Sequence, residues 1–139
     1  MIEFPEITFT VARPCSINAH TRHTRTGVSY TTPKGREFSE RIRVSAMQAK
    51  RRILWPDLDT ILLAEVSYIL YGCPRMDADA PAKIVRDALQ GIFYHDDKIV
   101  EDGPHRFGEG SGPLLKLIKH APELSVSVKI LGMISQKKL

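Results

Sequence analysis

The segment from residue 62 to residue 70 restricts the fold more than any other stretch, because it is the clearest strand in the chain. Its residues alternate between two sets, and a period of two is typical of a β-strand. One set is Leu62, Ala64, Val66, Tyr68 and Leu70, and the other is Leu63, Glu65, Ser67 and Ile69. Gly72-Cys73-Pro74 closes this strand, and Asp77 and Asp79 follow at once. The strand therefore delivers an acidic motif to one end of the predicted sheet.

The other expected elements surround this strand. They are strands over 7–11 and 124–130, a short strand beginning at 99, and helices over 35–53 and 79–90. The buried face of the first helix is expected to comprise Phe38, Ile42, Ala46, Ala49 and Ile53, which recur at helical spacing. Asp79 is the expected N-cap of the second helix. The order of elements predicts an α+β fold, a two-layer sandwich in which helices pack on one face of a small mixed β-sheet.

The length of 139 residues is typical of one domain, so we expect a single domain over 1–139. Residues 15–35 are basic and lack an apolar period, which predicts a long exposed loop with a short hairpin around 26–28. Residues 103–113 contain four glycines and two prolines, which predicts a flexible loop. No window approaches 18 consecutive apolar residues and the N-terminus lacks a secretion signal, so we expect a cytoplasmic protein with no membrane partner.

Charge is divided unevenly along the chain. Residues 1–56 carry ten Lys/Arg against four Asp/Glu, a net charge of +6, whereas residues 57–139 carry ten against twelve, a net charge of −2. Seven of those twelve acids lie between Asp77 and Asp102. An acidic pocket on a basic protein suits a polyanion only if a cation fills the pocket, so this pattern favours a metal site over a solvated acidic surface.

The acidic residues have a spacing that could bring them together. Asp77 and Asp79 lie between a strand end and a helix start, and Asp97 begins the next strand. Carboxylate oxygens suit Mg²⁺, which can activate water and offset negative charge on a phosphodiester. Lys83 lies one helical turn beyond Asp79, so its ammonium could reach a phosphate or the attacking water; the alternative is a solvated lysine paired with Asp79 or Asp87. The residues alone indicate a metal-dependent nuclease acting on nucleic acid.

Three segments together resemble the RusA-type Holliday-junction resolvases. They are Asp77-Ala78-Asp79-Ala80-Pro81-Ala82-Lys83, Asp87-Ala88-Leu89, and Phe93-Tyr94-His95-Asp96-Asp97-Lys98-Ile99-Val100. The order of strand, basic loop, helix and long strand before them is also similar to that family. The resemblance implies a RusA-like fold and a homodimeric endonuclease that cuts four-way DNA junctions symmetrically in recombination and repair. It implies Mg²⁺ as cofactor, with Mn²⁺ as a substitute.

Carried over by position, the resemblance makes Asp77, Asp79 and Asp97 the catalytic metal-binding acids and Lys83 the catalytic lysine. Asp96 is a candidate for a residue that supports the metal ligands without itself binding the metal. The candidate DNA contacts, which would bind phosphates without reading sequence, are Arg22, Arg25, Lys50, Arg51, Arg52 and Arg75.

The chain departs from the family in two places. Ala80 stands where the family usually has Asn, and the arginine cluster before the first Asp is reduced to Arg75. Two alternatives to a junction resolvase follow. The protein could be a catalytically impaired relative that binds branched DNA without cutting it, or a nuclease whose substrates are flaps or other branched DNA.

Overall fold

The computed structural model describes residues 4–14, 21–23, 25, 27, 29–114 and 120–134, with only the backbone described for 21–23, 29 and 30. Four strands form one mixed sheet in the order β1-β6-β4-β5. Their bounds are β1 Glu6–Ala12, β4 Ile61–Tyr71, β5 Val100–Phe107 and β6 Glu123–Met133. Strand β6 runs antiparallel to both β1 and β4, whereas β5 runs parallel to β4. The strands predicted over 7–11, 62–70 and 124–130 are confirmed.

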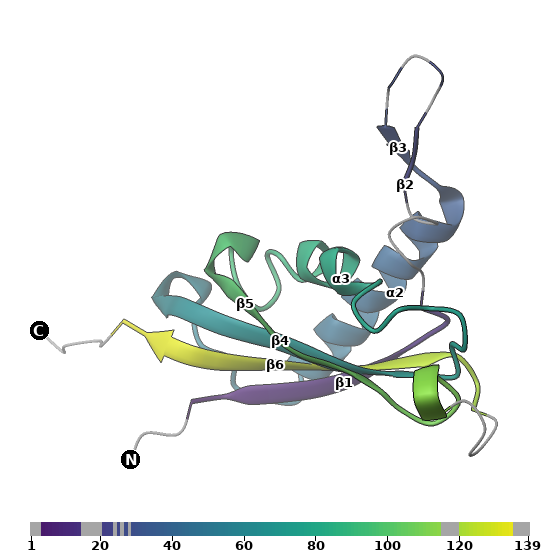
Figure 1. The fold of residues 1–139 in the computed structure, drawn as a ribbon. Coiled ribbons are helices and arrows are strands. Elements are labelled where there is room, and N and C mark those ends of the chain that lie inside the picture. Colours follow the sequence, from purple (N-terminus) through teal and green to yellow (C-terminus); the bar gives the residue numbers. More distant parts are fainter. Residues whose placement is uncertain are drawn as a thin grey trace, which may run out of the picture.

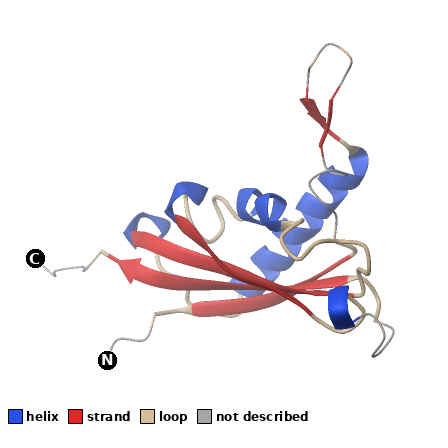
Figure 2. Ribbon diagram, viewed as in Figure 1, coloured by secondary structure: helices blue, strands red, loops and turns tan. Residues whose placement is uncertain are grey.

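Two helices, α2 (Pro33–Lys50) and α3 (Ala82–Ala88), cover one face of this sheet (Figure 2). The inner face of β4 supplies Ala64, Val66, Tyr68 and Leu70 to the core, and every second residue of β1, and of β6 as far as Ile130, is buried in the same way. Phe38 and Ile42 of α2 meet this face and are fully buried. The structure thus has the predicted α+β architecture, with helices on one face of a small mixed sheet.

Helix α2 begins and ends earlier than predicted. It begins at Pro33 because the Thr32 side chain accepts a hydrogen bond from the Gly35 amide at 3.1 Å, which caps the helix, and proline suits the first turn. After Lys50 the chain enters a turn, so Ile53 lies outside the helix and is exposed rather than buried. The basic loop expected over 15–35 therefore ends at Thr32.

A small hairpin precedes α2. Strands β2 (Thr21–His23) and β3 (Ser29–Thr31) pair antiparallel around the predicted turn, and Gly27 has the positive φ of 84° that such a turn uses. The hairpin projects from the N-terminal end of α2, away from the sheet (Figure 1). The rest of the predicted loop, 15–20, lies outside the described residues.

The loop predicted over 103–113 is wrong in its first half, because β5 continues to Phe107. Gly103 and Pro104 occupy a bulge, where the register shifts between Val66 and Tyr68 of β4. Glycine fits there because a Cβ atom would lie 2.9 Å from side-chain atoms of Glu65 and Ser67. Proline is tolerated because β5 is an edge strand and a bulge leaves one residue unpaired. The segment 115–119 lies outside the described residues.

Helix α3 is shorter than predicted, and Asp79 is not its N-cap. The N-cap position belongs to Pro81, and no side chain caps the helix. The predicted buried stripe, Ile84, Val85, Ala88 and Leu89, is confirmed. None of the described helices is both long enough and apolar enough to cross a membrane.

Candidate active site

The acidic turn between β4 and α3 presents two exposed carboxylates, Asp77 and Asp79. Their backbone carbonyls accept hydrogen bonds from the amides of Ala80 (3.1 Å) and Ala82 (3.0 Å), which folds the segment into tight turns. The buried Ser111 hydroxyl accepts a hydrogen bond from the Cys73 amide at 2.8 Å and so anchors the start of the turn. Within the described part of the chain, neither carboxylate has a hydrogen bond or ion pair. Both are therefore available to a ligand.

A second acidic group forms around Asp97. The pKa of its carboxyl is raised, first by a hydrogen bond with the Asp87 side chain and then by burial and the charges of Asp87 and Asp96. Asp96 accepts a hydrogen bond from the Lys98 amide at 2.9 Å and caps the short 3-10 helix η2 (Asp97–Ile99); this bond lowers the pKa of Asp96. Sequence reasoning did not select Asp87 as a site residue, although it noted the Lys83–Asp87 spacing.

Lys83 pairs with Asp87 rather than with Asp79. Its ammonium lies 3.0 Å from the Asp87 carboxylate, one helical turn along α3, and both side chains are largely exposed. Exposed pairs at this spacing contribute little to stability, about 0.3–0.5 kcal/mol. The lysine can therefore leave Asp87 for a phosphate at little cost. The pair brings Lys83 into the same charged group as Asp97.

The donor set suits a hard cation, although the structure does not assemble the predicted trio. The described residues include no group of three His, Cys, Asp or Glu side chains arranged to hold a metal ion. The side chains that shift the pKa of Asp97 are Asp87 and Asp96 rather than Asp77 or Asp79. Two carboxyl groups crowded enough to raise one pKa are stabilised when a cation offsets their repulsion, and Mg²⁺ often takes only one or two carboxylates with several waters.

A partly buried set of polar contacts joins α3 to β5 and to Tyr94, and sequence reasoning missed it. The Arg86 guanidinium lies 3.1 Å from the Asp102 carboxylate, and the Tyr94 hydroxyl donates to the Arg86 carbonyl at 2.6 Å. Burial is the main reason that the pKa of Tyr94 is raised well above its usual range, and the charge of Asp97 raises it further. The first contact ties α3 to β5, and the second ties α3 to the segment that follows it.

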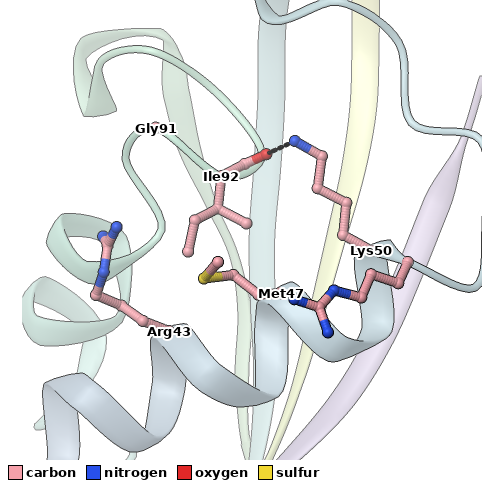
Figure 3. Close-up of a pocket in the computed structure, with 6 residues that line it drawn as sticks. Arg43, Met47, Lys50, Gly91 and Ile92 are labelled. Carbon is pink, nitrogen blue, oxygen red and sulfur yellow. Dashed lines mark hydrogen bonds between the residues drawn. The ribbon is translucent and has the colours of Figure 1, made fainter.

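The predicted phosphate contacts do not form one patch. Arg43, Lys50 and Arg51 line a cavity of about 350 Å³ with Met47, Gly91 and Ile92 (Figure 3). Lys50 donates to the Ile92 carbonyl at 2.7 Å, and Arg43 donates to the Ala88 carbonyl at 2.8 Å. These two cations therefore tie α2 to the end of α3, while Arg51 is exposed.

The other predicted contacts are more scattered. Arg52 is exposed and lines a second hollow beside Thr8 and Thr10 of β1. Arg75 is exposed two residues before Asp77, and Arg25 is exposed at the hairpin. The side chain of Arg22 lies outside the described residues. Trp55, which donates from its indole nitrogen to the Phe93 carbonyl at 3.1 Å, packs against the core.

Replacing Asp97 with asparagine is expected to raise the melting temperature of the metal-free protein at neutral pH. The raised pKa means that the folded state holds the Asp97 proton more tightly than the unfolded chain does. This contribution to stability is complete below the ordinary pKa of an aspartate and is lost as pH rises through the raised value. The asparagine variant avoids that loss, so its advantage should shrink on acidification toward about pH 4.

Melting curves in EDTA across this pH range measure the effect, with Glu40→Gln as a control that removes one exposed acid from α2. An advantage of Asp97→Asn that does not change with pH would contradict the prediction.

A basic chain that presents two exposed, unpaired carboxylates between a strand and a helix of a mixed α+β domain has features expected of a nuclease. The family model described as endodeoxyribonuclease RusA matches residues 12–129, which is most of the chain, and the protein belongs to this family. A comparison with curated proteins gave no match.

Proposed function

We propose that the protein is an endodeoxyribonuclease that cuts four-way DNA junctions in recombination and repair, with Mg²⁺ held by Asp77, Asp79 and Asp97. The observation that carries this proposal is the pair of exposed carboxylates in the acidic turn, Asp77 and Asp79, which have no hydrogen bond or ion pair among the described residues of a chain with a net charge of +4. An acidic site on a basic protein suits a polyanion when a cation fills the site. Membership of the RusA family supports DNA as the substrate.

Different residues of the chain would have different roles in cleavage. When bound, Mg²⁺ neutralises charge on the phosphodiester and lowers the pKa of a coordinated water, and Mn²⁺ is expected to replace it. Lys83 would exchange its pairing with Asp87 for the scissile phosphate. Asp96 would hold η2, and with it Asp97, in place through its bond to the Lys98 amide. Two symmetric nicks need two symmetric sites, so we infer a homodimer.

The DNA backbone would follow the exposed arginines. Arg25 on the hairpin, Arg51 and Arg52 after α2, and Arg75 in the acidic turn are all exposed. Phosphate contacts of this kind give affinity that depends on salt but not on sequence. Lys50 would attract DNA through its positive charge rather than through a direct phosphate contact, because its ammonium already donates a hydrogen bond to the Ile92 carbonyl.

A second candidate function is binding to branched DNA without cutting. Two observations favour it: Ala80 carries no polar side chain beside Asp79, and the described part of the chain assembles no three-residue metal group. Loss of a residue that orients a metal ligand can reduce affinity or activity by about 10–100-fold. Such a protein would bind junctions tightly and yield no Mg²⁺-dependent products.

The experiment that tests these candidates compares labelled four-way-junction, flap and linear duplex DNA at equal protein concentration, with Mg²⁺ or with EDTA. Symmetric nicks confined to the junction and dependent on Mg²⁺ are the expected result. Cutting confined to flaps would identify a different branched substrate, and tight binding without products would identify the non-cutting protein.

Replacing Arg51 with glutamine is expected to weaken junction binding and to make it less sensitive to salt. Each phosphate contact that is lost reduces the slope of log affinity against log salt by about 0.9. Arg51 suits this test because none of the described residues forms a hydrogen bond or ion pair with its guanidinium. Binding measured at several salt concentrations checks the prediction.

Lys129→Gln is the matched control for Arg51→Gln. It removes the same charge from β6, where Lys129 is exposed between the buried residues Val128 and Ile130. Equal slopes for Arg51→Gln and the wild type would show that Arg51 does not contact DNA.

A further inference from the structure

The cavity between α2 and the chain that follows α3 combines positive charge with an apolar wall. Its volume is about 350 Å³. Its lining residues are Arg43, Met47, Lys50, Arg51, Gly91 and Ile92 (Figure 3). Three of these six are cations and none is acidic. Sites for small organic ligands typically measure about 300–1,000 Å³, so the cavity holds more than a bare phosphate. Its charge and its size together indicate an organic anion as the ligand.

Backbone carbonyls hold two of the cations in place. Lys50 donates to the Ile92 carbonyl at 2.7 Å. Arg43 donates from one terminal nitrogen to the carbonyls of Ala88, at 2.8 Å, and Gln90, at 3.4 Å. Both cationic side chains are half-buried. A ligand therefore meets charges that are already ordered, which reduces the entropy that binding would cost.

Arginine N–H groups remain for a ligand at this cavity. Arg51 is exposed, and none of the described residues forms a hydrogen bond or ion pair with its guanidinium. The two nitrogens of Arg43 that do not bind the carbonyls also have no partner in the described part of the chain. Arginine forms short, charge-assisted hydrogen bonds with phosphate oxygens, and its planar group also stacks on flat rings. A phosphate is therefore the anion that these groups suit.

Met47 and Ile92 form the apolar part of the wall. Their side chains point toward each other, with Arg43 on one side and Lys50 on the other (Figure 3). Met47 is 46% exposed although it is apolar. A methionine thioether makes favourable contacts with aromatic rings. Gly91 adds no side chain, and a Cβ atom there would meet nothing within 4 Å, so this side of the cavity is open.

We propose that this cavity binds one nucleotide, with its phosphate on Arg51 and Arg43 and its base against Met47. This inference rests on the proposed function, because branched DNA is the expected source of the nucleotide; a free nucleotide offers the same chemistry. An unpaired base at a flap or a branch point costs less to place in a cavity than a base taken out of a duplex. The cavity would therefore favour branched over plain duplex DNA, which phosphate contacts alone do not do.

The test follows the methionine methyl signals by NMR in EDTA, which prevents cleavage. Met47→Leu identifies the Met47 signal, and Met133, at the end of β6, serves as the reference methyl. The protein is titrated with deoxyadenosine monophosphate, with deoxyribose 5-phosphate, with duplex DNA that carries a single-stranded flap, and with the same duplex without the flap. A base stacked on Met47 shifts its methyl signal upfield through the ring current, whereas a phosphate alone does not.

The expected result is an upfield shift with the nucleotide and with the flap DNA only. Equal responses to the nucleotide and to deoxyribose 5-phosphate would overturn the proposal, because the cavity would then accept phosphate without a base. A shift with the nucleotide but with neither DNA would overturn DNA as the source. An unmoved Met47 signal beside Mg²⁺-dependent cleavage would overturn this site and leave the proposed function standing, and the reverse pair of results would do the opposite.

A pair of variants tests the same site through DNA affinity. Met47→Glu places a carboxylate in the cavity, where it would compete with the ligand for Arg43 and Arg51. Val44→Glu is the matched control, because Val44 is 44% exposed on the same helix and does not line the cavity. Met47→Glu is expected to bind flap DNA about 2–10-fold more weakly than Val44→Glu, while both bind plain duplex equally. Equal affinities of the two variants for flap DNA would overturn the proposal.

Discussion

Asp79→Asn is expected to abolish Mg²⁺-dependent cleavage of a four-way junction while junction binding survives. The substitution keeps the size of the side chain and removes its charge, and the Asp79 carboxylate has no partner in the described part of the chain that would be disturbed. Changes to residues that merely orient a metal ligand cost about 10–100-fold, so losing a ligand should reduce the cleavage rate by more than about 100-fold. Single-turnover cleavage and a gel-shift assay, run side by side, measure the two properties.

Glu40→Gln is the matched control, because it removes one exposed carboxylate from α2. Its cleavage rate should equal that of the wild type. Undiminished cutting by Asp79→Asn would show that Asp79 is not a metal ligand. Loss of cutting together with loss of junction binding would instead point to a role in folding or in DNA contact.

Gly72→Ala is expected to destabilise the protein by about 2–5 kcal/mol, the sum of backbone strain and overpacking. Gly72 has a φ of 64°, which L-residues rarely adopt, and a Cβ atom there would lie 2.2 Å from the His120 carbonyl oxygen and 2.7 Å from the Ala121 carbonyl. The backbone itself must move to relieve such contacts. The free energy of unfolding from urea denaturation measures the loss. Since Gly72 joins β4 to the acidic turn, any folded fraction should also cut more slowly.

Gly91→Ala separates the two causes. Gly91 has a similar φ of 82°, but a Cβ atom would meet nothing within 4 Å. Its substitution should therefore cost only the backbone strain, about 1–2 kcal/mol. Equal costs at the two positions would mean that the segment 120–121 moves aside freely, and that this contact does not hold the acidic turn in place.

Local patterns predicted the sheet well because burial in a sheet repeats with a period of two. The run 62–70 alternates, and β4 occupies it with one further residue at each end. Composition was a poorer guide over 103–113, where Gly103 and Pro104 suggested a loop. Both residues fit the bulged edge of β5, and a position at the edge of the sheet depends on strand order, which composition does not reveal.

The candidate site, like the sheet, was predicted from the sequence only in part. Asp77, Asp79 and Asp97 stand out as residues of a local motif, and their role in binding metal stays a prediction. The contact between Asp87 and Asp97 and the pairing of Arg86 with Asp102 join α3 to the segments that follow it. Such contacts depend on how a short helix docks on the sheet. Periodicity indicates which face of α3 is buried, but it does not indicate which charged residue that face will meet.

The hydrogen bonds from α2 to the chain after α3 change how the basic residues of this protein should be interpreted. Lys50 and Arg43 satisfy the carbonyls of Ile92 and Ala88, and Ile92 lies only five residues before Asp97. Removing either cation therefore disturbs the support of the acidic cluster as well as the field that attracts DNA. A mutational survey that neutralises every lysine and arginine would therefore measure the loss of this support and the loss of DNA attraction as one combined effect. Evolution faces the same coupling, because the positive charge at these two positions cannot change without loosening the chain that leads to the residues proposed to hold the metal.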